Sequence, residues 1–301
     1  MAHKTSAVAG EEPVDVLFAL QDKFDLMDMA AKPDQCLDLV WSLNGARQAN
    51  KDPALSIDSQ AFEITIAAAE PKVLSAQGVI IGSQVSWKEA HERLSDFDIL
   101  VIVGGNSDAI IKAKAEPLDL ITKFSEIQKE DPTRERTIMS VCTGSLFLAQ
   151  QGILAGLSAT THPDYMTAFE NLCSHAAVRN VAERTDVIED ARYVVNNLRF
   201  DIGDEDENPY VHSKSDGRRP SNARKGSMSF KSANSRRESI TRRAAMRLGG
   251  LRVITCGGVS AGVDGALYLI SALVSDEAAD EAARMMQWTW TKGLVIDGLD
   301  V

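Results

Sequence analysis

Four short runs of apolar and β-branched residues, separated by helix-like stretches, most constrain the fold of this 301-residue chain. The strand-like runs cover Val14–Leu20, 97–106, 136–142 and 251–258, and the helix-like stretches cover 86–95, 115–130 and 144–154. Strands that alternate with helices predict a mostly parallel, doubly wound α/β sheet with helices on both faces. Functional sites in such sheets lie at the carboxyl ends of the strands, where Gly104–Gly105, Cys142 and the stretch after Asp25 fall.

The segment 261–290 predicts a buried helix followed by an amphipathic one. Ser275, Asp276 and Glu277 give the second helix an acidic first turn, which favours a helix start because anions are stabilised at helix N-termini.

Composition narrows the class of protein. The formal charge of −11 and pI near 5.0 argue against general binding to nucleic acid or to an anionic membrane. Neither an apolar leader nor an apolar run of the ~20 residues needed to cross a membrane is present, so we expect a cytoplasmic protein, with the nucleus as the alternative. The four scattered cysteines have no spacing typical of a zinc site and are expected to be free thiols.

One segment departs from the pattern. Residues 203–249 contain 11 Lys and Arg against 6 Asp and Glu, with many serines, and predict a disordered basic insertion within one domain spanning 14–301. Residues 1–13 are expected to be a flexible N-terminus. Arginines precede Ser227 and Ser239 at the spacing that basophilic kinases favour. The segment is therefore either a solvated loop or a site of phosphorylation by a kinase.

Cys142 ends one strand-like run and is followed by Thr143, Gly144 and Ser145, which open a helix-like stretch. A strand, a nucleophile, small residues and a helix together are typical of a nucleophile elbow, and the helix N-terminus favours the thiolate. The alternative is a buried cysteine that acts as a small hydrophobic residue. The residues alone leave both interpretations open.

The stretch 140–165, "SVCTGSLFLAQQGILAGLSATTHPDY", resembles the elbow region of the ThiJ/PfpI superfamily, within the class I glutamine amidotransferase-like fold, and particularly its isonitrile hydratase-like branch. Three further stretches agree in order and spacing: 14–30, 97–106 and 251–273. The resemblance implies a flavodoxin-like doubly wound sheet with a nucleophile elbow, and a homodimer.

The resemblance also implies roles for individual residues. Cys142 matches the nucleophile, Thr143 the threonine that follows it in the isonitrile hydratase-like branch, and Asp28 the acid that hydrogen-bonds the sulfur. Gly104–Gly105 and the Thr143 N–H fall where the family forms an oxyanion-hole-like pocket. His162 matches a histidine near the cysteine in several branches, and a hydrogen-bonded loop histidine is the alternative.

Charge alone predicts how Asp28 would behave beside Cys142. Two anions in a low-dielectric pocket repel, so a carboxyl near a thiolate would have a raised pKa and could donate a proton. Asp22 and Asp25 are alternatives for this role by position. His91 is expected on a solvated helix face, and Cys256 is expected to pack in the core.

Two departures from the family pattern affect the expected substrate more than the fold. Residues 31–36 replace a short Ala-Gly-Pro turn, and Val103 stands where many relatives have proline. The first could move Asp28 or alter a dimer contact.

The resemblance implies a hydratase or lyase that converts a small-molecule isonitrile to an N-substituted formamide without metal or organic cofactor. Glyoxalase-like or deglycase-like activity on dicarbonyl compounds is the enzymatic alternative. Peroxide sensing through oxidation of Cys142, or a chaperone-like role, is the non-enzymatic alternative.

Overall fold

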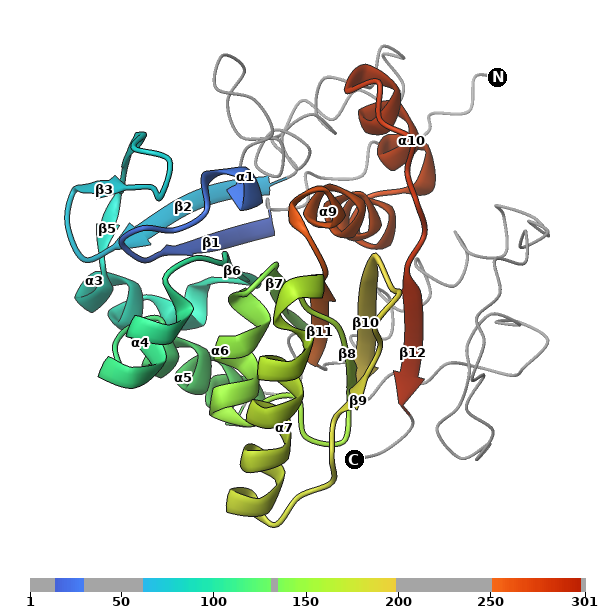
Figure 1. The fold of residues 1–301 in the computed structure, drawn as a ribbon. Helices are drawn as coiled ribbons and strands as arrows, with labels where there is room; N and C mark the ends of the chain where they lie inside the picture. The colour runs from blue at the N-terminus through green and yellow to red at the C-terminus, as the bar shows by residue number, and fades with distance from the viewer. Residues whose placement is uncertain (1–13, 30–61, 131–134, 199–250, 299–301) are drawn as a thin grey trace, which may run out of the picture.

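An eight-stranded sheet runs through the computed structural model, which describes residues 14–29, 62–130, 135–198 and 251–298 (Figure 1). The strand order is β12-β10-β11-β7-β6-β1-β2-β5, and every pairing except β10 with β11 is parallel. The bounds of these strands are β1 Val14–Leu20, β2 Phe62–Ala68, β5 Val85–Ser86, β6 Ile99–Ile102, β7 Arg136–Val141, β10 Tyr193–Leu198, β11 Leu251–Cys256 and β12 Leu294–Gly298. The predicted flavodoxin-like α/β fold is confirmed.

Helices cover both faces of the sheet (Figure 1). One face carries α3 Trp87–Glu92, α4 Ser107–Ala113, α5 Leu118–Glu130, α6 Gly144–Gln151 and α7 Met166–Asn180, and the other carries α1 Leu26–Met29, α9 Val259–Leu273 and α10 Asp276–Met285. Side chains that alternate along β1 serve the two faces: Phe18 packs in the core under α9, and Leu17 packs in the core under α3 to α7. The predicted acidic start of α10 is confirmed, since Ser275 Oγ accepts the Ala278 N–H at 3.1 Å.

Short elements complete the described chain. A two-stranded hairpin, β3 Lys72–Leu74 and β4 Ile80–Gly82, stands apart from the main sheet, and β8 Ser158–Ala159 pairs with β9 Asp186–Val187. The 3-10 turns η1 Leu94–Asp96 and η2 Pro163–Tyr165 lie in loops. No helix in the described residues is long and apolar enough to span a bilayer. The segments 1–13, 31–36 and 203–249, including Ser227 and Ser239, lie outside the described residues.

A buried carboxylate ties the C-terminal part of the described chain to the sheet. Asp264 of α9 is fully buried and accepts hydrogen bonds from Arg192 Nε (2.7 Å), Trp288 Nε1 (2.9 Å) and the Thr291 N–H (3.0 Å). Because a buried charge is tolerated only when it is paired and hydrogen-bonded, this cluster fixes the path of the chain from α10 to β12.

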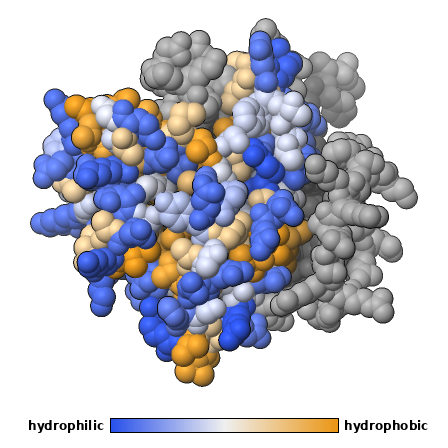
Figure 2. Space-filling model, in the orientation of Figure 1, coloured by the Kyte–Doolittle hydropathy of each residue, from blue (hydrophilic) through white to orange (hydrophobic). Residues whose placement is uncertain are grey.

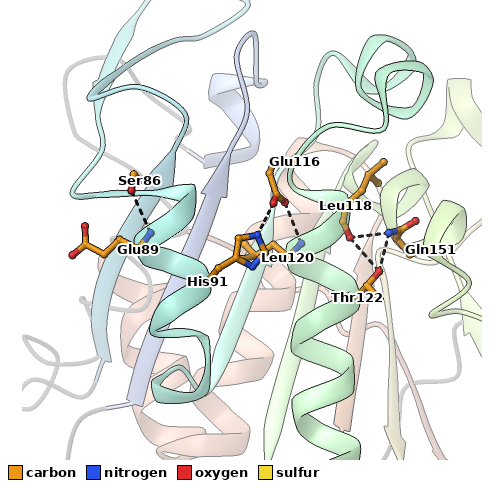
Figure 3. A network of polar contacts seen from close by, with 8 residues as sticks. All are labelled: Ser86, Glu89, His91, Glu116, Leu118, Leu120, Thr122 and Gln151. Carbon is orange, nitrogen blue, oxygen red and sulfur yellow. Dashed lines mark hydrogen bonds and ion pairs between the residues drawn. The ribbon is translucent and has the colours of Figure 1, made fainter.

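The expectation that His91 lies on a solvated face is wrong. The His91 ring is half-buried, and its Nε2 forms a hydrogen bond with Glu116, whose other carboxylate oxygen accepts the Leu120 N–H at 3.1 Å (Figure 3). The charged neighbours of His91 in the sequence could not indicate this, because Glu116 is 25 residues away along the chain. The histidine therefore joins α3 to the first turn of α5.

Candidate functional site

Cys142 occupies a sharp turn between β7 and α6. Its backbone has φ of +57°, a left-handed conformation that is uncommon for residues other than glycine. Its N–H donates to the Cys256 carbonyl (3.1 Å), and its own carbonyl accepts the hydroxyls of Ser145 (3.0 Å) and Thr161 (3.2 Å). Backbone strain of this kind persists only where the surroundings hold it, so these bonds define the elbow that the sequence predicts.

The close approach of the elbow to β6 requires glycine. A Cβ on Gly144 would lie 2.5 Å from the Ile102 carbonyl oxygen, and a Cβ on Gly104 would lie 2.5 Å from Asp28 Oδ2 and 2.7 Å from Thr143 Oγ1. Real Cβ atoms do not approach other heavy atoms this closely. The two glycines therefore allow Asp28, Thr143 and the cysteine turn to meet at one point.

Asp28 lies in α1, the short helix in the segment after β1, and is almost completely buried, with 2% of its surface exposed. Its Oδ2 accepts the Gly104 N–H at 2.9 Å, and its Oδ1 is buried without a conventional hydrogen-bond partner. The Cys142 thiol forms a hydrogen bond with this carboxyl. Of the three acids in the loop, Asp28 is therefore the one that the structure brings to the cysteine.

The pKa of Asp28 is raised to about 7, chiefly because burial disfavours the carboxylate and secondly because Asp25 is negatively charged nearby. The predicted increase of this pKa is confirmed. The expectation of a readily ionised Cys142 is not: burial and the charge of Asp28 raise the pKa of the thiol above its ordinary value, and together they outweigh the opposing effect of the Thr143 N–H. The pair therefore holds two protons below about pH 7 and a single proton above it.

The predicted oxyanion-hole donors are engaged by side chains of the protein. The Gly105 N–H donates to Thr143 Oγ1 at 2.9 Å, and the Thr143 N–H is hydrogen-bonded to the Cys142 sulfur. Gly105 itself has φ of +102° and no room for a Cβ. Because Thr143 Oγ1 already accepts a hydrogen bond, its hydroxyl hydrogen is directed to another acceptor, and Thr143 is the better candidate to donate to a bound molecule.

His162 lies at a neighbouring turn. Its Nδ1 accepts the Asp164 N–H at 3.2 Å, which places the proton of the neutral ring on Nε2, and its Cδ2 faces Gly258 after β11. Thr161, the preceding residue, bonds the Cys142 carbonyl. The structure thus brings Cys142, Asp28, Thr143, Gly104 and Gly105 together and places His162 at the edge of this group.

The other described cysteines are packing residues. Cys173 and Cys256 are buried free thiols, and burial raises the pKa of each. The expectation that Cys256 packs in the core is confirmed, because it is completely buried and its sulfur lies 2.6 Å from where a Cβ on Gly265 would be. No group of three or more His, Cys, Asp or Glu side chains that could hold a metal ion occurs in the described parts of the chain.

The sequence analysis did not identify Gln21, whose side chain forms hydrogen bonds with the loop at Gly104–Gly105. Gln21 is buried, and its Nε2 donates to the carbonyls of Val103 (3.0 Å), Gly104 (2.9 Å) and Gly105 (3.1 Å). A polar residue directly after a buried apolar strand was the signal available in the sequence. Because Gln21 holds these three carbonyls in place, it fixes the direction of the Gly104 N–H, which donates to the Asp28 carboxyl.

With this geometry in place, the chain can be compared with known proteins. Residues 51–197 match the model of the DJ-1/PfpI family. This match covers slightly less than half of the chain. The matched region contains Gly104, Gly105, Cys142, Thr143 and His162, and it begins after the loop that carries Asp28. No curated protein matches the chain.

Solved structures agree with the DJ-1/PfpI fold. Drosophila melanogaster DJ-1beta aligns with a TM-score of 0.52 at 15% identity, covering 93% of this chain and 100% of that one. An AraC family transcriptional regulator from Pseudomonas putida aligns with a TM-score of 0.51 at 14% identity, covering 91% and 100%. A ThiJ/PfpI family protein from Pseudomonas syringae aligns with a TM-score of 0.51 at 16% identity, covering 96% and 85%. At these identities the likeness concerns the fold alone.

Replacing Gly104 with alanine tests how tightly the site is closed. The added methyl group would collide with Asp28 Oδ2 and with Thr143, so we expect a loss of about 1–3 kcal/mol in the free energy of unfolding. We also expect slower modification of Cys142, because Asp28 must move. Urea unfolding and timed alkylation measure the two effects. Alanine at Gly82, which has no such close neighbour, is the control, and equal behaviour of the two variants would contradict the assignment.

Proposed function

We propose that this protein is a cysteine-dependent hydratase that acts on isonitriles and releases N-substituted formamides. The observation that carries the proposal is the pairing of Cys142 at a left-handed turn with the buried acid Asp28, followed directly by Thr143. The resemblance of this arrangement to the isonitrile hydratase-like branch of the family supports the substrate class.

The chemistry requires a nucleophile, one mobile proton and a water molecule. The Cys142 sulfur would attack the terminal carbon of the isonitrile while the proton shared with Asp28 passes to that same carbon, giving a thioimidate. Water would then add to the carbon, one of its protons would pass to the substrate nitrogen and the other to the Cys142–Asp28 pair, and the carbon–sulfur bond would break. The sum is one isonitrile and one water converted to one formamide, with no change of oxidation state.

Thr143 would act on the second half of this sequence. Its hydroxyl accepts from Gly105, so its own hydrogen can be donated to the substrate nitrogen or to the attacking water. The burial of Cys142 and Asp28 would strengthen each electrostatic interaction within the site.

An assay of the wild-type chain with a simple alkyl isonitrile tests the proposal. We expect formamide to form catalytically, with a rate that rises with pH through about 7, because the doubly protonated pair has no group that can take the thiol proton. Absence of turnover across pH 5–9 would reject the hydratase.

The alternatives give different results in parallel experiments. Conversion of a dicarbonyl compound in place of the isonitrile would indicate a glyoxalase-like or deglycase-like enzyme. Selective gain of oxygen atoms at Cys142 under dilute peroxide, without turnover of either substrate, would indicate a redox sensor. The expected homodimer and the expected action of a kinase on residues 203–249 remain separate predictions, which size-exclusion chromatography and phosphopeptide mapping address.

A further inference from the structure

The β3–β4 hairpin packs against the loop that carries Asp28, although its residues have no part in the predicted site. The Lys23 N–H donates to the Leu74 carbonyl (2.8 Å), and the Ala76 N–H donates to the Phe24 carbonyl (2.9 Å). The hairpin is at the upper left of Figure 1, and the same region of Figure 2 has apolar surface among hydrophilic residues. Exposed apolar side chains of this region are Met27, Leu74, Val79 and Ile80.

One side-chain pair links the tip of the hairpin to residues 21–28, the segment after β1 that we call the acid loop. Gln77 Nε2 donates to Asp25 Oδ1 at 3.0 Å, and Gln77 Oε1 accepts the Leu26 N–H at 3.0 Å. Asp25 Oδ1 also accepts the Met27 N–H at 2.9 Å. Both hydrogen-bonding ends of the Gln77 amide are thus used on the residues just before Asp28.

Asp25 is also part of a ring of hydrogen bonds around the reactive acid. The Asp25 N–H donates to the Gly104 carbonyl (2.9 Å), the Gly104 N–H donates to Asp28 Oδ2 (2.9 Å), and the Asp28 N–H donates to the Asp25 carbonyl (3.2 Å). Movement of Asp25 would therefore move both Asp28 and Gly104, which donates to the Asp28 carboxyl.

We propose that Asp25 and Gln77 are positioning residues whose side chains clasp the β3–β4 hairpin onto the acid loop and fix Asp28 and its proton beside Cys142. The inference rests on the proposed function for its catalytic meaning, but its geometry is independent of the substrate. Asp25 acts by two routes: its hydrogen bonds set the path of the loop, and its charge disfavours loss of the proton from the Asp28–Cys142 pair.

The charged and titratable groups around the pair define what a pH measurement reports. Asp25 faces Asp28 from the same loop, and Cys142 faces it from the end of β7. Cys256 of β11 senses the charge of Asp28. On α9, which packs against α1, the charged group is Asp264, whose carboxylate is paired with Arg192. Asp25 is thus a neighbouring charge that acts on both members of the pair, because it raises the pKa of Asp28 and the pKa of Cys142.

The test is the pH dependence of Cys142 alkylation by iodoacetamide in the full chain, followed on the Cys142 peptide by mass spectrometry. Asp25→Asn keeps an oxygen for Met27 and Gln77 and removes only the charge, so we expect the midpoint to move to lower pH by roughly 0.5–1 unit. Asp22→Asn is the matched control, an equal charge change at an exposed position of the same loop, and should leave the midpoint in place. An unchanged midpoint in Asp25→Asn, or the same shift in both variants, would overturn the electrostatic role.

Gln77→Ala separates the clasp from the charge. It retains every acid, so we expect faster amide hydrogen exchange at residues 24–28 and at least a twofold change in the alkylation rate at high pH. Unchanged exchange together with an unchanged rate would overturn the clasp. Because alkylation needs no isonitrile, a chain that lacks hydratase turnover but gives these shifts would reject the proposed function and retain the positioning roles.

Discussion

Replacing Cys142 with serine is expected to lower isonitrile hydration by at least about a thousandfold. A serine hydroxyl fits the space of the thiol, but the raised pKa of Asp28, about 7, is too low to make it an effective base toward an alcohol. Formamide release, measured by chromatography at matched protein concentration, gives the rate.

Cys173→Ala is the control for this experiment, because Cys173 is a buried free thiol of α7 in the core on the α3 to α7 side of the sheet. We expect it to retain the wild-type rate with a small loss of stability. Equal losses in the two variants would indicate an effect on folding and would contradict the role of Cys142.

Replacing Asp28 with asparagine is expected to lower the rate by roughly a hundredfold or more, in the range that general acid–base groups contribute. Asparagine retains an oxygen for the Gly104 N–H, so the loop should keep its place. The variant cannot exchange a proton with the sulfur, and the increase of rate through about pH 7 should disappear with it.

Asp28→Asn should also be more stable than wild type at neutral pH. The pKa of Asp28 is raised in the folded chain, so its contribution to stability is fully present below pH 4 and is lost as pH rises toward about 7. The stability difference between variant and wild type should therefore grow over this interval, which urea unfolding at several pH values measures. A variant that is both inactive and unstable at neutral pH would contradict this account of Asp28.

The sequence was sufficient to predict the four central strands of the sheet. Apolar runs identified β1, β6, β7 and β11, because strands buried on both faces are continuous in hydrophobicity. The strands β10 and β12 were not predicted, since they lie at one edge of the sheet and mix polar with apolar residues, as in Asn196 and Asn197. These segments are strands because they pair with neighbouring strands of the sheet, and their own residue types do not indicate it.

The site was predictable where a single short segment contains both the turn and the small residues that allow it. Cys142 and Gly144 are two positions apart in the chain, and their small neighbours indicate the elbow. Contacts between distant segments were not predictable: the Gly105 N–H is used by Thr143, 38 residues later, and the Asp25 side chain is bonded by Gln77, 52 residues later. Burial also reversed the expected direction of the Cys142 pKa, because a helix start in the sequence does not tell how far the sulfur lies from solvent.

The central claim is that the Cys142–Asp28 pair loses its first proton near pH 7 and shares the remaining one above that pH. The direct measurement is the rate of Cys142 alkylation as a function of pH in the wild-type chain and in Asp28→Asn. We predict a wild-type midpoint near pH 7, where the pair loses its first proton. In Asp28→Asn we predict a clearly higher midpoint, because only the buried thiol is left to ionise. A wild-type midpoint at the ordinary thiol value of about 8.5 that is unchanged in Asp28→Asn would contradict the claim.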